Sequence, residues 1–108
     1  MKVSELKDRL NLHAVTLPEP DREVNGVYIG DLLSFVMGRA HEGNIWITIM
    51  SNINVMAVAT LVNTSCILLA EGVSLDEEVI KTANEKGINI LGTDKTAYEI
   101  AVEISKLV

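Results

Sequence analysis

Short apolar runs alternate with amphipathic stretches along most of the chain. Residues 45–49 are β-branched and aromatic and residues 66–70 are continuously apolar, as is typical of buried strands. Residues 97–107 place apolar side chains at i, i+3, i+4, i+7 and i+10, which indicates an amphipathic helix. We expect strands at residues 24–29, 45–49, 66–70 and 88–91, each followed by a helix, and a further short helix at the N-terminus.

Helix starts are marked by residues whose side chains accept a hydrogen bond from a free backbone amide. The expected N-caps are Ser4, Asp31, Asn54, Ser74 and Thr96. The last two begin capping boxes, because a glutamate follows each of them by three positions. Residues 13–17 read as a short extended piece before a proline-containing loop at residues 18–22.

The alternation of strands and helices, with short connections, implies βαβ units. We predict a small three-layer α/β domain with a mainly parallel four-stranded sheet flanked by helices. A chain of 108 residues fits one domain, and no linker or internal repeat divides residues 1–108.

Charge and hydropathy restrict the environment of the protein. Residues 43–70 contain no ionisable side chain except the thiol of Cys66, yet asparagines and serines interrupt them, so we read a protein core rather than a membrane span. The N-terminus is charged and unlike a signal peptide, and a lone cysteine forms no disulfide within the chain, so we expect the cytoplasm. The net charge of −6 repels phosphate backbones, so we expect no nucleic-acid partner.

Glycines and polar residues follow each predicted strand. Because the carboxyl ends of parallel strands share one edge of a sheet, these residues favour a small pocket for a phosphate or a nucleotide there. The candidate ligand-binding residues are Gly30, Ser51, Asn52, Asn54, Gly72, Thr93 and Thr96. The same residue types serve helix caps and turns, and Asp31 and Asp94 at this edge oppose an anion, so the structural interpretation stays open.

No constellation of residues indicates catalysis. Neither GxGxxG nor GxxxxGK[ST] occurs, His13 and His41 lack a metal-ligand spacing, and Cys66 lies inside an apolar strand. We therefore predict that the chain is not an enzyme, with no cofactor and no metal site.

The predicted helix at residues 55–62 has no charged face, and Thr60 is its one polar side chain. A helix that is apolar all round must be covered all round. We expect a second copy of the chain to cover it in a twofold symmetric homodimer. The expected interface residues are Trp46, Met50, Val55, Met56, Ala59 and Val62. The alternative is that residues 1–20 cover this helix within the same chain.

Several segments together carry a resemblance to a known family. They are residues 27–34, 44–49, 54–59, 66–72, 87–91 and 96–99. With them the chain resembles a stand-alone DRTGG-domain protein, similar to the N-terminal domain of HPr kinase/phosphorylase. Related domains occur in phosphotransacetylases and between the CBS domains of some pyrophosphatases, where they are regarded as regulatory or dimerising. The chain departs from the family pattern at residues 51–54, where an Asp-Arg pair is expected, and at Glu71-Gly72, which replaces a glycine pair.

The resemblance implies a non-catalytic regulatory or interaction domain that acts as a homodimer in signalling or metabolic regulation. It also implies two alternatives: a sensor of an adenine nucleotide or phosphate, and a phosphotransferase component related to HPr kinase. A protein partner in a signalling or redox pathway is a further implication of the resemblance.

Overall fold

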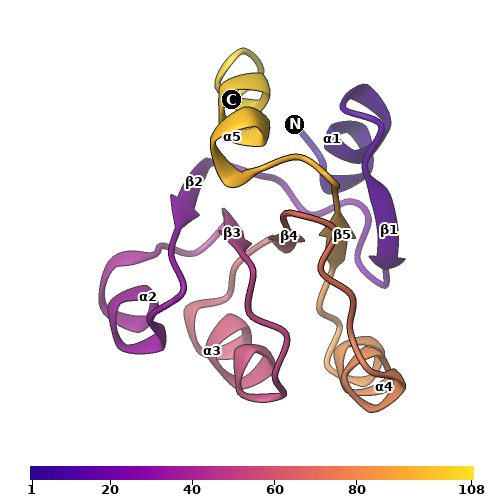
Figure 1. Ribbon diagram of the computed structural model, residues 1–108, viewed down its shortest axis with the longest axis vertical. Helices are drawn as coiled ribbons and strands as arrows, with labels where there is room; N and C mark the ends of the chain where they lie inside the picture. The colour runs from indigo at the N-terminus through magenta and orange to yellow at the C-terminus, as the bar shows by residue number, and fades with distance from the viewer.

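Five strands form a single sheet in the order β1-β5-β4-β3-β2 (Figure 1). β2 to β5 run parallel, whereas β1 pairs antiparallel with β5. The computed structural model describes residues 1–108, and its strands are β1 (His13–Thr16), β2 (Gly26–Ile29), β3 (Asn44–Thr48), β4 (Cys66–Leu69) and β5 (Ile90–Gly92). The sheet is therefore mixed but mostly parallel, and β1 and β2 are its two edges.

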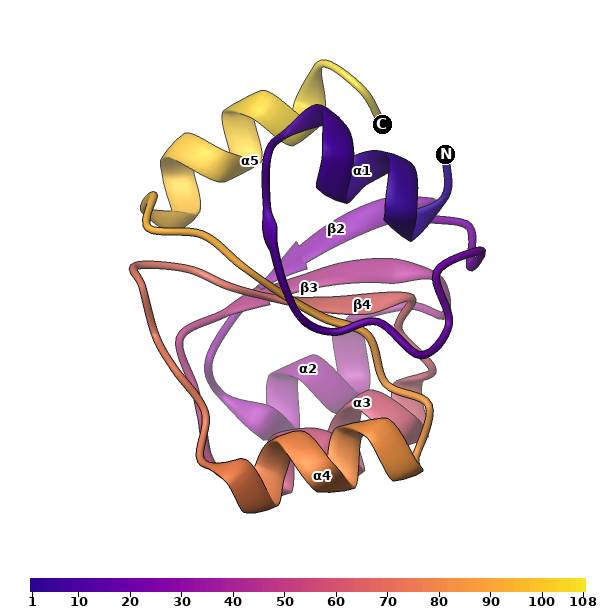
Figure 2. The same cartoon turned by 90° about the vertical axis from the view of Figure 1, so that its right-hand side faces the viewer.

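Helices cover both faces of this sheet. They are α1 (Val3–Arg9), α2 (Leu33–Arg39), α3 (Asn54–Val62), α4 (Glu77–Glu85) and α5 (Ala97–Ser105). Figure 2 shows α1 and α5 on one face and α2, α3 and α4 on the other. Two apolar clusters, of 13 and 12 buried residues, fill the two spaces between helices and sheet. This three-layer α/β arrangement confirms the predicted fold class.

The sheet has one strand more than predicted. Residues 13–17, expected only to be extended, supply β1, which pairs with β5 and carries an irregular register between Ala14 and Thr16. A short extended piece does not reveal its partner, because strand pairing depends on contacts between residues far apart in the sequence. The other four strands lie where the pattern placed them, with ends shifted by one or two residues.

Four of the five expected N-caps are wrong, and only Thr96 is confirmed. The carboxylate of Asp31 accepts hydrogen bonds from the Thr48 hydroxyl and the Ile49 amide at the end of β3, so α2 begins only at Leu33. Ser74 lies in the loop before α4, whose N-cap is Asp76. Ser4 lies inside α1, which follows Lys2. Asn54 is the first residue of its helix rather than the cap.

The expected interface on α3 is wrong for most of its residues. Trp46, Val55, Met56 and Ala59 are buried within a single copy, and Met56 is only 2% exposed. Met50 and Val62 are partly buried against the same core. The sheet, α2 and α4 cover this helix. Residues 1–20 do not cover it, because α1 lies on the opposite face of the sheet and residues 13–16 form the edge strand β1 (Figure 2).

The outer surface of α3 nevertheless lacks charge. Ile53 and Leu61 lie there together with Ala57 and Thr60, all exposed, and Leu61 is 70% exposed. One face of this uncharged helix is therefore buried in the core, and the other face, which is less hydrophobic because it includes Ala57 and Thr60, is exposed to solvent.

Polar side chains fasten the amino ends of the strands. Asn89, 1% exposed, donates to the carbonyls of Glu19 and Ser65 and accepts from the Glu19 amide. The Ser65 hydroxyl donates to the Glu23 carbonyl, and Thr16 donates to the Ile88 carbonyl. These bonds hold the connection from β1 to β2 across the end of the sheet. The buried hydroxyl of Thr64 has no partner.

None of the helices combines the length and the apolar character needed to cross a membrane.

Candidate functional site

The residues predicted after each parallel strand lie at one edge of the sheet, as expected. The Ala70 amide donates to the Thr48 carbonyl, which joins the ends of β3 and β4. The Gly72 amide donates to the Thr93 carbonyl at 2.9 Å, which joins the loops after β4 and β5. The carboxyl ends of the strands therefore form a continuous row of loops.

Most of the polar candidates in this row serve local structure. The Asn52 carboxamide accepts from the Asn54 amide at the start of α3. Thr96 and Glu99 form the predicted capping box of α5, with Thr96 accepting from the Glu99 amide and Glu99 from the Thr96 amide. Hydrogen bonds from the Thr96 backbone amide and the Thr96 side chain to the Glu99 carboxyl lower the pKa of this exposed group. Ser51 is exposed.

Gly30 also has a structural task. Its carbonyl accepts from the indole Nε1 of buried Trp46 at 2.9 Å, and its amide donates to the Ile47 carbonyl. A Cβ at Gly30 would lie 2.9 Å from the Tyr28 ring. The glycine thus avoids a close contact with Tyr28 at the end of β2, and it lies outside the cavity that the next candidates line.

Gly72 and Thr93 line a cavity of about 570 Å³ between the β4–α4 loop, the β5–α5 loop and β1. Its apolar lining consists of Leu10, Val15, Val73, Leu75 and Ile80, and the other side chains that line it are those of Asn11, His13, Ser74, Thr93, Asp94 and Lys95. Small-molecule pockets combine apolar side chains with convergent polar groups, and this cavity offers both. Of the seven predicted ligand-binding residues, the structure brings only these two into one cavity.

The turn beside this cavity is strained. Glu71 and Gly72 both have positive φ, 58° and 70°. A side chain at such a φ costs on the order of 1–2 kcal/mol, whereas glycine adopts it freely. The glycine pair expected at this position by resemblance therefore has a conformational reason, and Glu71 departs from it at an energetic cost.

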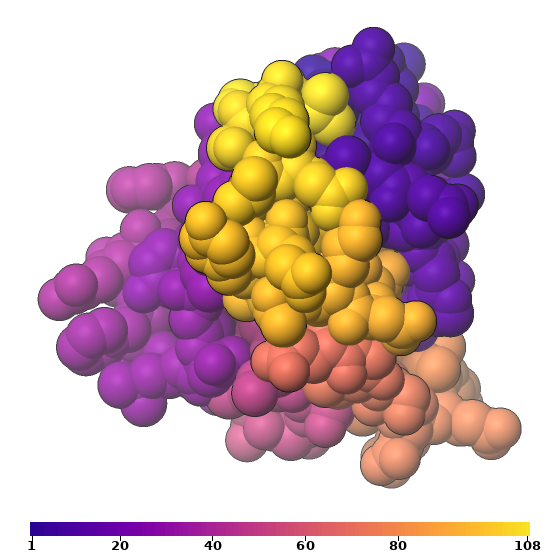
Figure 3. Space-filling view, turned by 45° about the horizontal axis from the view of Figure 1, so that its top comes forward, coloured from indigo at the N-terminus to yellow at the C-terminus, as the bar shows by residue number.

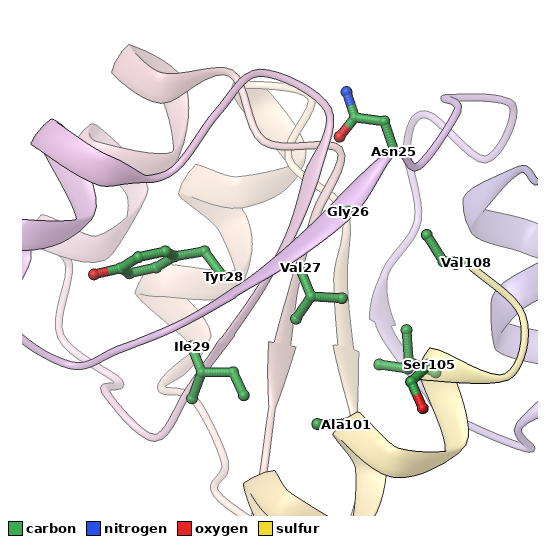
Figure 4. A pocket seen from close by; sticks show the side chains of 9 residues that line it. Asn25, Gly26, Val27, Tyr28, Ile29, Ala101, Ser105 and Val108 are labelled. Atoms are coloured by element: carbon green, nitrogen blue, oxygen red, sulfur yellow. The ribbon is translucent and has the colours of Figure 1, made fainter.

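A second cavity, of about 550 Å³, lies between β2 and α5 (Figure 4). Val27 and Ile29 project from β2 toward Ala101 and Ser105 of α5. No charged side chain lines it. The sequence analysis missed this site, because the exposure of Val27 and Ile29 depends on β2 being an edge strand, and strand order cannot be read from a local pattern.

The reactive residue types lie apart. Burial raises the pKa of the Cys66 thiol to about 12. His13 lines the cavity beside β1, whereas exposed His41 lies in the loop before β3. No cluster of three or more His, Cys, Asp or Glu side chains could hold a metal ion.

A family model settles the relationship of the chain. The model of the DRTGG domain matches residues 10–107. The chain belongs to the DRTGG family. A sequence search among proteins with curated descriptions finds no match.

A solved structure shares the fold of this DRTGG domain. It is the regulatory region of Clostridium perfringens pyrophosphatase, containing CBS and DRTGG domains, in complex with its activator, diadenosine tetraphosphate. The superposition has a TM-score of 0.72 at 17% sequence identity and covers 93% of this chain. The DRTGG domain described here spans 44% of that regulatory chain, so the likeness establishes the fold alone.

Proposed function

We propose that this DRTGG domain is a non-catalytic regulatory module that acts through protein association, as a homodimer, in signalling or metabolic regulation. The observation that carries the proposal is the uneven distribution of apolar surface. We call residues 26–62 together with residues 97–108 the β2 side of the molecule, and the remainder the β1 side. In Figure 3, α5, in yellow, separates the indigo N-terminal segment from the purple residues of the β2 side.

Every exposed large hydrophobic residue belongs to the β2 side. They are Val27, Ile29, Leu32, Phe35, Met37, Ile49, Ile53, Leu61, Tyr98, Val102 and Val108. Of the nine basic and fifteen acidic residues, six lie on the β2 side: Asp31, Arg39 and Glu42 in residues 26–62, and Glu99, Glu103 and Lys106 in residues 97–108. Monomeric proteins rarely expose apolar patches larger than a few hundred Å², so this distribution supports an interaction surface.

A second copy of the chain is the partner that the charge distribution favours. The net charge of −6 is carried mainly by the β1 side, so two copies joined through their β2 sides keep most of their negative charges apart. A basic partner would instead be drawn to the β1 side. The regulatory role draws additional support from the pyrophosphatase, in which a DRTGG domain belongs to a regulatory region. A protein partner in a signalling or redox pathway stays a prediction of the family resemblance.

Size-exclusion chromatography with light scattering tests the homodimer. At micromolar concentration we expect twice the monomer mass, and we expect added salt not to dissociate the dimer, because an apolar interface is not screened. A monomer mass across the micromolar range would reject the proposal.

A small-ligand sensor is the second candidate, favoured by the cavity that contains Gly72 and Thr93. Its apolar side chains suit a nucleobase, and Lys95, whose ammonium also pairs with Glu103, supplies a cationic group for a phosphate. His13 adds ring nitrogens that can form hydrogen bonds with a ligand. Asp94 in the same lining opposes a phosphate and suits a hydroxyl donor such as a ribose. The pyrophosphatase region binds diadenosine tetraphosphate, which makes adenine nucleotides the first ligands to test.

A thermal-shift titration with ATP, AMP and inorganic phosphate tests this candidate. A ligand that binds the folded state raises the midpoint of unfolding. We expect His13→Ala to reduce the shift and His41→Ala, an exposed histidine outside the cavity, to leave it unchanged. No shift at millimolar ligand, or equal shifts in both variants, counts against this cavity as the site.

A further inference from the structure

The outer edge of β2 is an unpaired strand edge. β2 pairs with β3 on one side only. The Gly30 amide donates to the Ile47 carbonyl, and amide direction alternates along a strand, so the amides of Val27 and Ile29 point away from the sheet. Such an edge is a template for pairing with another strand.

β2 lacks the charge, the proline and the bulge that protect many natural edges, and its short length is shared with β1. Its sequence, Gly-Val-Tyr-Ile, contains no charge and no proline, and its register with β3 has no bulge. The opposite edge, β1, has an irregular register and is followed by Pro18 two residues after its end. Of the two edges, only β2 is therefore suited to strand addition.

Apolar residues flank this edge on both faces of the sheet. α5 lies over β2 on one face with Tyr98 and Val102 exposed, and α2 lies at the β2 end of the opposite helical layer with Leu32 and Phe35 exposed (Figures 1 and 2). The uncharged cavity between β2 and α5 opens beside the same edge (Figure 4). A partner that continues the sheet would cover both flanks at once.

We propose that two copies of this domain associate by antiparallel pairing of their β2 strands, which joins the two sheets into one of ten strands. The arrangement rests on the proposed function. A twofold axis perpendicular to the sheet keeps equivalent faces together, so α5 lies beside the partner's α5 and α2 beside the partner's α2. Each copy thereby closes the β2–α5 cavity of the other.

The available surface suits this arrangement. Six exposed apolar side chains and the strand backbone offer several hundred Å² per copy, on the order of the roughly 800 Å² that a standard interface buries on each partner. The six are Val27, Ile29, Leu32, Phe35, Tyr98 and Val102, which are between 37% and 77% exposed. Pairing also removes apolar surface from water and exchanges the hydrogen bonds between strand amides and water for hydrogen bonds between strands.

Matched lysine substitutions test where the copies meet. Ile29→Lys places a charge on the β2 edge and, by symmetry, a second charge close to it in the dimer. Leu61→Lys places the same charge on the outer face of α3, away from the edge. By light scattering and sedimentation we expect Ile29→Lys to weaken dimerisation at least about 100-fold, as several kcal/mol of like-charge repulsion implies, and Leu61→Lys to leave it unchanged.

The two proposals fail in distinguishable ways. If the unchanged chain is monomeric, both the homodimer and the β2 pairing are rejected. If the chain is dimeric and Leu61→Lys, but not Ile29→Lys, dissociates it, the homodimer stands and the β2 pairing is overturned. Thermal unfolding of both variants shows whether either substitution acts through loss of folding.

Single cysteines give a measurement that does not depend on a charged variant. The substitutions Val27→Cys, Tyr28→Cys and Ile29→Cys span the edge. At a symmetric antiparallel junction, one of these cysteines lies close enough to the same cysteine of the second copy to form a disulfide. Native Cys66 is buried, so we expect it to form no disulfide between copies. We expect a cross-linked dimer from at least one of the three and none from Leu61→Cys; cross-linking only through Leu61→Cys overturns the β2 pairing.

Discussion

The β1 side and the β2 side of the molecule differ in how the edge strand of the sheet is covered. On the β1 side, residues 1–24 wrap the end of the sheet and are held by backbone bonds such as Val3 to Arg22 and Val24 to Met1. Buried Asn89 fixes the same wrap through three hydrogen bonds. On the β2 side, the edge strand is bare and the neighbouring helices expose apolar side chains.

This difference teaches that one layered fold can be closed at one edge and left open at the other. The closed edge uses specific polar contacts, and those of Asn89 are costly to break because this side chain is buried. The open edge uses apolar surface, which is tolerated only when something covers it. Four substitutions probe this contrast, beginning with the largest expected effect.

Comparing Met56→Ala with Leu61→Ala distinguishes the contributions of the inner and outer faces of α3 to stability. Met56 is packed in the core, so its truncation should lower the free energy of unfolding by about 2–5 kcal/mol. Leu61→Ala, on the exposed face, should change it by less than about 0.5 kcal/mol in the monomer. Urea denaturation at low protein concentration measures both, and equal losses would contradict the assignment of the two faces.

Asn89→Ala tests the lock on the β1 side. It removes three hydrogen bonds and leaves the Glu19 amide and two carbonyls without partners, which should cost about 2–3 kcal/mol. Asn84→Ala, at an exposed position in α4, is the matched control and should cost nothing. Faster hydrogen exchange at the Glu19 amide in the Asn89 variant alone would locate the loss; protection unchanged there would argue against the lock.

Thr96→Ala removes the cap of α5, which lies over β2. We expect a loss of about 1 kcal/mol at neutral pH, with Thr96→Ser retaining most of the stability. Hydrogen bonds from the Thr96 amide and hydroxyl lower the pKa of Glu99 from its ordinary value of 4.5. The ionised Glu99 therefore stabilises the fold above that value, and this contribution disappears as the pH falls through the lower folded pKa. The difference in free energy of unfolding between the unchanged chain and Thr96→Ala should therefore decrease in acid. Urea denaturation at several pH values measures it, and a difference that does not change with pH contradicts the role of Glu99.

Glu71→Gly has the smallest expected effect and the opposite sign. It relieves the positive φ of Glu71, and the gain exceeds the entropy cost of glycine, so the free energy of unfolding should rise by about 0.5–1 kcal/mol. Glu71→Ala keeps the Cβ and should give no such gain. Denaturant midpoints of the two variants measure the difference, and a gain shared by alanine would mean that charge rather than backbone strain matters.

Local pattern predicted much of the fold because strands and helices here differ in period and composition. Buried runs such as Cys66–Leu69 and the Thr96 capping box are signals carried by a few adjacent residues. The predicted caps at Asp31 and Ser74 are wrong because tertiary contacts decide where each helix begins. The Asp31 carboxylate binds the Thr48 hydroxyl at the end of β3. The loop that contains Ser74 extends to Asp76, because Leu75 packs against the core before α4 begins.

The candidate sites were harder to predict. Gly72 and Thr93 share a cavity because β4 and β5 are neighbours, whereas Gly30 and Asn52 serve the ends of other strands. The exposed residues of the β2 edge carried no local signal, since Val27 and Ile29 would read identically in a central strand.

The sequence by itself determined the α/β class, the four parallel strands and the lack of charge in the middle of the chain, because these follow from period and composition among near neighbours. Tertiary structure alone decided that β1 joins the sheet, that β2 lies at its edge, and that α3 buries Met56 while exposing Leu61. The physical reason is that burial and strand order are set by which distant segments pack together. A local pattern states that a surface is apolar but not whether the chain itself covers it.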